Sequence, residues 1–121
     1  MDAYGHVNNA VYLTYLEQAR DAWVADVLDG VTDTWDFVLA HVGVDFRSEL
    51  VQDDGFVIVR CRLGEIGRSS ISTREEILKA DGTVSARAES VVVPRDRATG
   101  KARKLSDEER AALERDFAGD H

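Results

Sequence analysis

One helix-like stretch followed only by strand-like stretches is the feature that most constrains the fold of this chain. From Asn9 to about Leu28, apolar residues recur at three- and four-residue steps, which is the period of an α-helix. They are Val11, Tyr12, Leu16, Ala19, Trp23 and Val27. Asn8 or Asn9 is the predicted N-cap, and Gly30 is the predicted stop. A helix of this length carries a broad apolar stripe, so a second layer must cover it.

The rest of the chain supplies that layer as strands. Apolar alternation predicts strands within residues 37–50, 57–63, 70–79 and 84–93. Turn signals at residues 53–55 and 80–82 are short, so we expect an antiparallel meander in chain order. Ser106 and Glu109 form a capping-box pattern that opens a short helix through about Phe117. The expected fold class is α+β, a long helix packed on one face of a curled antiparallel sheet.

The composition fits a single globular domain over residues 1–121. Lys and Arg number 15 and Asp and Glu 23, so the net charge is −8, which argues against nucleic acid or an anionic membrane as partner. Nothing resembles a signal peptide or a membrane span, so we expect a cytoplasmic protein. Cys61 is the single cysteine, which excludes an intrachain disulfide, and we expect it to pack as a small apolar side chain.

The most informative motif lies directly before the predicted long helix. Residues 2–9 read Asp2-Ala3-Tyr4-Gly5-His6-Val7-Asn8-Asn9 and combine an acid, a glycine, a histidine and two amides. Such a turn places a carboxylate beside the N–H groups of a helix start, which lack intrahelical partners and favour negative charge. This pairing suits attack on a carbonyl group.

This motif resembles that of the hot-dog-fold acyl-CoA thioesterases, in the branch related to 4-hydroxybenzoyl-CoA thioesterase. Further agreement comes from Tyr12-Leu13, Leu16-Glu17-Gln18-Ala19-Arg20, Asp45-Phe46-Arg47, Ile66-Gly67-Arg68-Ser69-Ser70, Asp81-Gly82, residues 86–88, and residues 91–93 continuing to Asp96. The resemblance implies hydrolysis of an acyl-CoA to a free acid and coenzyme A. Family members usually have a strand before the acid-glycine-histidine turn. Here that first strand is missing from the sequence, so we expect either that the sequence is truncated or that this protein lacks the strand.

The resemblance assigns roles within the turn. Asp2 matches the catalytic acid, either as a nucleophile that forms a mixed anhydride or as a general base for water. The backbone N–H of Asn9 matches the oxyanion donor, while Gly5 and His6 shape the turn. Tyr12 either walls the acyl pocket or belongs to the core. Glu17 is a second possible acid, although an exposed or paired carboxylate is the simpler interpretation.

Coenzyme A carries several phosphate charges, so basic side chains must gather locally in this acidic chain. Arg68, with Ser69 and Ser70 at a strand start, is one candidate for pantetheine or phosphate contact. Lys101, Arg103 and Lys104, together with Arg95 and Arg97, form the other, although such a run is usually a solvated loop. No metal-ligand spacing joins His6, His41 and His121, so we expect no metal and no cofactor apart from the substrate's own coenzyme A.

Two alternatives remain open. A hot-dog hydroxyacyl-thioester dehydratase would share the fold but needs a differently arranged histidine and acid. A non-catalytic acyl-thioester-binding protein would bind without turnover. The resemblance also implies a homodimer or homotetramer with the site between subunits.

Overall fold

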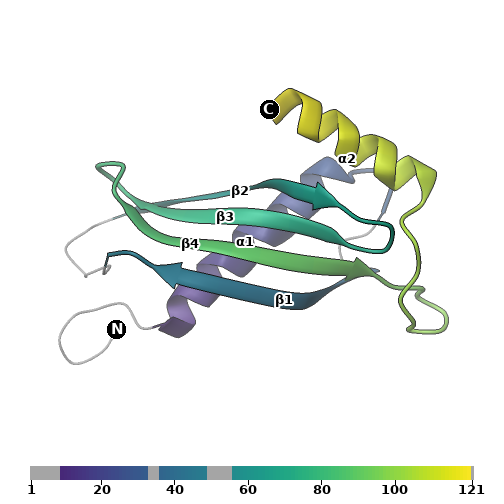
Figure 1. Cartoon of the computed structure of the whole chain (residues 1–121), viewed down its shortest axis with the longest axis horizontal. Coiled ribbons are helices and arrows are strands. Elements are labelled where there is room, and N and C mark those ends of the chain that lie inside the picture. Colours follow the sequence, from purple (N-terminus) through teal and green to yellow (C-terminus); the bar gives the residue numbers. More distant parts are fainter. Residues whose placement is uncertain (1–8, 33–35, 49–55, 121) are drawn as a thin grey trace.

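The computed structural model describes residues 9–32, 36–48 and 56–120 (Figure 1). The predicted site residues Asp2, Gly5 and His6 lie outside these ranges, as does the turn predicted at residues 53–55. The elements in chain order are α1 (Asn9–Val27), β1 (Phe37–Phe46), β2 (Val57–Ile66), β3 (Ile71–Lys79), β4 (Val84–Pro94) and α2 (Asp107–Asp120). The predicted helix–strands–helix order is confirmed.

Helix α1 follows its predicted bounds closely. It begins at Asn9, and the chain turns away at Gly30, whose φ of 76° lies in the left-handed region that glycine adopts without strain. Its most buried positions are four residues apart: Tyr12, Leu16, Arg20, Val24 and Leu28. The predicted stripe therefore exists, but its centre is a buried arginine that the apolar pattern did not reveal.

The sheet is antiparallel with strand order β1-β4-β3-β2. The predicted meander is right for β2, β3 and β4 and wrong for β1, which pairs with β4 at the opposite edge from β2. Residues 47–56 separate β1 from β2, too long a connection for a tight hairpin. Pairing with β4 also places Val44 against the cluster around Tyr12 and Leu16, which explains why that edge is favoured.

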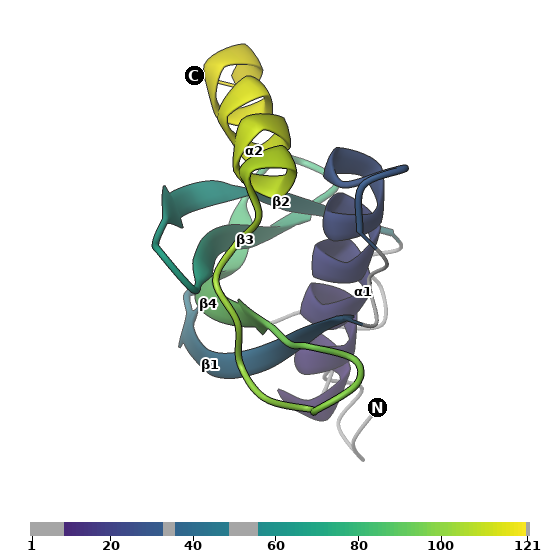
Figure 2. The same ribbon diagram turned by 90° about the vertical axis from the view of Figure 1, so that its right-hand side faces the viewer.

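Two apolar clusters lie between α1 and the sheet, which curves around one side of the helix (Figure 2). Tyr12 and Leu16 pack with Ile77, Ala86 and Ala88 near the start of α1. Val24 and Leu28 form the second cluster near its end, with Leu63, Ile71, Val92, Leu105, Ala112 and Leu113. Because Leu105, Ala112 and Leu113 come from α2 and the segment before it, α2 closes the core at one end only.

The predicted turn and cap are confirmed. At the hairpin between β3 and β4, Gly82 has a φ of 91°, and the Asp81 carboxylate accepts a hydrogen bond from the Thr83 N–H at 2.8 Å. At the start of α2, Ser106 Oγ accepts from the Glu109 N–H at 3.1 Å, and Glu109 Oε1 accepts from the Ser106 N–H at 2.8 Å. In the part of the chain that the structure describes, no helix combines the length and apolarity needed to cross a membrane.

Candidate functional site

The start of α1 lies against the strand ends that carry Phe46 and Ser85. The Tyr12 ring meets that of Phe46 edge-on, with centroids 5.0 Å apart and an interplanar angle of 88°. The Tyr12 hydroxyl lies 3.2 Å from Ser85 Oγ, which itself donates to the Ser48 carbonyl at 2.6 Å. Because Ser85 donates its hydroxyl proton to Ser48, the Tyr12 hydroxyl is the donor in the bond between Tyr12 and Ser85. Tyr12 is 3 % exposed and therefore belongs to the core beneath the helix start.

A groove of about 620 Å³ lies between α1 and β1, which is an edge strand of the described sheet. Its lining is Glu17, Arg20, Asp21 and Val24 from α1, Phe37, Val38 and Leu39 from β1, and Val92 from β4. Burial raises the pKa of the Asp21 carboxyl, and the neighbouring charge of Glu17 adds to this, while Arg20 opposes it. The alternative acid Glu17 thus lies on the rim of a cavity, as an exposed side chain.

A buried polar network supports this groove from below. Arg20 Nη1 donates to Ser90 Oγ at 3.0 Å and lies 3.4 Å from Glu75 Oε1. Glu75 also accepts from the hydroxyl groups of Thr73, at 2.8 Å, and Ser90, at 3.2 Å. Arg20 is 5 % exposed and Glu75 1 %. A charged pair buried this deeply must be fully hydrogen-bonded, which fixes α1 against β3 and β4.

Cys61 lies half-buried near this network. Burial raises the pKa of its thiol to about 12, and the Glu75 charge adds to the effect. The thiol therefore stays protonated at neutral pH, as expected for a packing residue.

The predicted basic contacts gather at the other end of the sheet. Arg68, Ser69 and Ser70 form the turn between β2 and β3, and the Arg68 carbonyl accepts from the Leu105 N–H at 3.0 Å. This bond joins the turn to the segment that contains Lys104. The structure thus brings together two groups of predicted residues that are more than thirty positions apart in the sequence.

The side chain of Arg103 is already hydrogen-bonded at this end of the sheet. Its guanidinium donates to both Glu109 oxygens, at 2.7 and 2.9 Å, and Thr32 Oγ1 donates to Glu109 Oε2 at 2.6 Å. These bonds hold the pKa of Glu109 at about 2 against the cost of its burial. Lys101 and Lys104 are exposed, and the structure shows neither side chain in an ion pair with any residue that it describes.

The helix start and the basic end lie far apart within the chain. Tyr12 meets Ser85 at the beginning of β4, whereas the basic segment follows Pro94 at the end of that strand (Figure 1). The strand between them has 11 residues, which spans roughly 35 Å at about 3.3 Å per residue. The Asn9 backbone therefore lies far from Arg68, Lys101 and Lys104 of its own chain.

Comparisons with known proteins agree on one family. A family model described as the thioesterase-like superfamily matches residues 1–113. The long-chain acyl-CoA thioesterase FadM of Escherichia coli strain K12 is 33 % identical over 94 % of this chain and 89 % of its own. A thioesterase of Thermus thermophilus, solved with coenzyme A and zinc, has a TM-score of 0.84 and 28 % identity over 95 % of this chain and 84 % of that chain. YbaW of Escherichia coli has a TM-score of 0.77 and 31 % identity over 96 % and 90 % of the two chains.

Within residues 9–32, 36–48 and 56–120, no group of three or more His, Cys, Asp or Glu side chains is arranged to hold a metal ion. The site residue that sequence reasoning overlooked is Arg20, with its partners Thr73, Glu75 and Ser90. The four-residue spacing of Tyr12, Leu16, Arg20 and Val24 was the available signal, because a charge on that line must be buried.

Proposed function

The chain belongs to the thioesterase-like superfamily, and on that basis we propose that it hydrolyses acyl-CoA thioesters to a free acid and coenzyme A. The observation that supports the proposal is that α1 begins at Asn9, the last residue of the acid-glycine-histidine sequence motif of residues 2–9. The first N–H groups of a helix are oriented along its axis without intrahelical acceptors. They are suited to stabilise the negative oxygen that forms when a thioester carbonyl is attacked.

Asp2 is the proposed catalytic group, by either of two routes. As a general base it removes a proton from water while the water oxygen adds to the carbonyl carbon. The tetrahedral intermediate then expels the coenzyme A thiolate, which takes up a proton. As a nucleophile the carboxylate itself adds and expels the thiolate, and water then hydrolyses the mixed anhydride. Both routes place the developing oxyanion at the Asn9 N–H, and neither needs a metal or a redox cofactor.

The edge strand β1 supports a homo-oligomer. It has 10 residues and lies at one edge of the described sheet, so one row of its backbone groups has no strand beside it there. Leu39 and Phe46 on β1 and Leu13 on α1 are 43–45 % exposed. An exposed apolar edge of this length suits antiparallel pairing with β1 of a second copy.

That pairing would complete the site. Phe46 lies at the helix-start end of β1, whereas Phe37 lies at the other end, in the groove. Antiparallel pairing about a two-fold axis sets Phe46 of one copy near Phe37 of the other. The helix start of one subunit then lies beside the groove and the basic end of its partner. Coenzyme A would bind there, with Lys101, Lys104 and Arg68 near its phosphates and Arg103 holding their segment in place.

Release of free thiol from a panel of short, long and aromatic acyl-CoAs tests the proposal. Turnover with any of them supports hydrolysis, and the preferred chain identifies the acyl group. Binding without turnover would contradict it in favour of a non-catalytic acyl-thioester-binding protein. Loss of water from a hydroxyacyl-CoA, with no thiol released, would favour the dehydratase. The cytoplasmic location belongs to the same proposal, because acyl-CoA is an intracellular substrate.

A further inference from the structure

The groove between α1 and β1 has a buried charge in its lining. Arg20 is one of its lining residues and is only 5 % exposed, whereas Glu17 and Asp21 lie on its rim as exposed side chains. The rest of the lining is apolar: Val24, Phe37, Val38, Leu39 and Val92. A guanidinium in such surroundings is stable only when acceptors meet its N–H groups.

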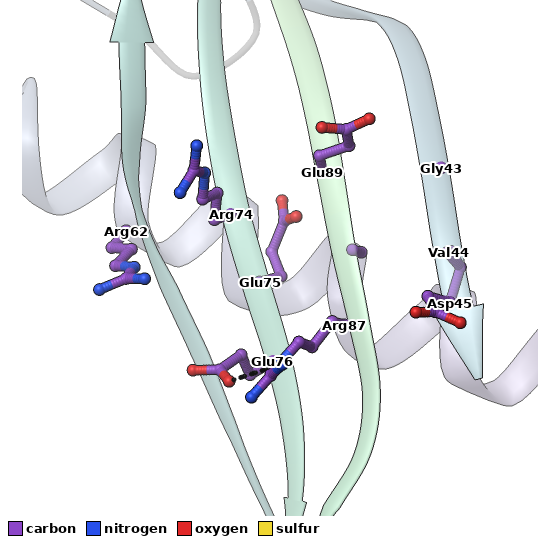
Figure 3. A pocket seen from close by; sticks show the side chains of 10 residues that line it. Gly43, Val44, Asp45, Arg62, Arg74, Glu75, Glu76, Arg87 and Glu89 are labelled. Carbon is purple, nitrogen blue, oxygen red and sulfur yellow. Dashed lines mark hydrogen bonds and ion pairs between the residues drawn. The ribbon is translucent and has the colours of Figure 1, made fainter. Parts of the chain in front are cut away.

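The acceptors of Arg20 lie on its sheet side. Arg20 Nη1 donates to Ser90 Oγ at 3.0 Å and lies 3.4 Å from Glu75 Oε1. Glu75 is buried under α1, while its neighbours on β3, Arg74 and Glu76, point to the opposite face, in front of the sheet with α1 behind it (Figure 3). Because Glu75 balances the charge of Arg20, the pair as a whole does not attract an anion into the groove.

The other donors of Arg20 remain available. A guanidinium also carries N–H groups on Nε and Nη2. Within residues 9–32, 36–48 and 56–120, the structure shows no hydrogen bond from either of these atoms of Arg20. Since Arg20 lines the groove, these donors lie on its groove side. An oxygen atom of a bound molecule would accept from them, whereas a plain hydrocarbon chain would leave them unpaired.

The rim carboxylates determine which kind of oxygen fits. Glu17 and Asp21 are one helical turn apart, and burial together with the Glu17 charge raises the pKa of Asp21. A second carboxylate inside the groove would be repelled by both. A hydroxyl group can accept from Arg20 and donate to Asp21, since these two residues line the same groove.

We propose that this groove binds an acyl chain that carries a hydroxyl group, with Arg20 as the donor and Asp21 as the acceptor. This inference rests on the proposed hydrolysis of acyl-CoA and names the class of acyl group. The volume of about 620 Å³ is in the range of small-molecule sites, and the apolar lining accommodates the hydrocarbon part of the chain. Arg20 and Asp21 are then specificity-determining residues, because a chain without the hydroxyl group leaves buried donors unpaired.

The test measures binding without turnover. It uses acyl-CoA analogues in which a methylene group separates the sulfur from the carbonyl carbon, so that they cannot be hydrolysed. The chain length is constant, and one hydroxyl group is moved along the chain. For at least one position, calorimetry should give a Kd about tenfold lower than for the unsubstituted chain. Equal Kd values at every position would overturn the inference, because the donors of Arg20 would then bind water only.

Two variants assign the preference to the two residues. Arg20→Met with Glu75→Gln replaces the buried pair by neutral side chains of similar size. Asp21→Ala removes the acceptor from an exposed position. Each should reduce the tenfold preference to about twofold or less, while the unsubstituted chain still binds. Because the readout is a ratio of two Kd values for one variant, a partial loss of folded protein does not imitate it.

Asp26→Ala, on an exposed part of α1 outside the groove lining, is the matched control and should keep the preference. A preference that survives in the Arg20 and Glu75 double variant or in Asp21→Ala would overturn the inference. Thiol release from the corresponding thioesters separates it from the proposed function. Turnover without a hydroxyl preference would contradict this inference alone, whereas a hydroxyl preference in binding without thiol release would contradict the hydrolysis alone.

Discussion

The two ends of helix α1 are held in different ways. At its C-terminal end, Glu109 joins Arg103, Thr32 and Ser106 through charge-assisted hydrogen bonds, and α2 covers the core. At its N-terminal end, the Tyr12 hydroxyl reaches Ser85, and Phe46 beside it is 45 % exposed. The C-terminal end of α1, here called the closed end, is covered and hydrogen-bonded by groups of its own chain. The N-terminal end, here called the open end, combines a helix N-terminus with exposed apolar surface.

Because the two ends of α1 are built differently, we expect substitutions at one end to affect stability and substitutions at the other to affect catalysis. Changes at the closed end should lower the free energy of unfolding, and changes on its exposed lysines should weaken substrate binding. Changes at the open end should stop turnover while the fold persists.

Glu109→Gln should have the largest effect on stability. Glutamine keeps the capping geometry but removes the charge that compensates Arg103, so we expect a loss of about 2–3 kcal/mol. Urea unfolding measures it. Glu108→Gln, an exposed neighbour in the same helical turn, is the matched control and should change stability by less than about 0.5 kcal/mol. An equal change in the free energy of unfolding for the two variants would contradict a stabilising role of the Glu109 charge.

The same carboxylate predicts a pH dependence. Its pKa is about 2 in the folded protein and 4.5 in its ordinary state, so its stabilising contribution is complete above pH 4.5. That contribution should disappear as the pH falls from 4.5 towards 2, with a total of up to about 3 kcal/mol. Chemical unfolding across this window should show a steeper decline for wild type than for Glu109→Gln. Parallel curves would assign the acid sensitivity to other groups.

Lys101→Gln with Lys104→Gln should have a smaller effect, confined to binding. Both side chains are exposed, so the loss of phosphate attraction should be about 1 kcal/mol, or roughly a fivefold rise in KM for acyl-CoA, with kcat unchanged. Initial-rate kinetics at low ionic strength measures both constants. Arg115→Gln on the exposed side of α2 is the control. An unchanged KM would show that the two lysines do not contribute to binding of acyl-CoA.

Local signals predicted most of the fold. Asn9 and Gly30 delimit α1, Gly82 requires a turn, and Ser106 with Glu109 form a reciprocal cap that depends only on neighbours in sequence. The position of β1 could not be found this way. Its partner β4 begins 38 residues after β1 ends, and the choice depends on which edge buries Val44.

The candidate site was predicted only in part, for the same reason. The helix start at Asn9 follows from a sequence motif. The hydrogen bond between Arg68 and Leu105, the residue after Lys104, comes from the fold. The engagement of Arg103 by Glu109 and the burial of Arg20 against Glu75 are tertiary contacts, invisible to charge counting. A basic segment of the sequence shows where positive charge lies, but not which of its side chains already form ion pairs with carboxylates.

The central claim is that Asp2 carries out the hydrolysis. The most direct test compares thiol release by Asp2→Asn and by wild type, on the best substrate of the acyl-CoA panel. Asparagine keeps the size of the side chain but neither attacks the carbonyl nor accepts a proton from water. Thiol release should therefore fall at least about 100-fold, with the unfolding midpoint unchanged. Asp26→Asn, on the exposed side of α1, should retain wild-type turnover. Wild-type turnover by Asp2→Asn would contradict the account and direct attention to Glu17 on the rim of the groove.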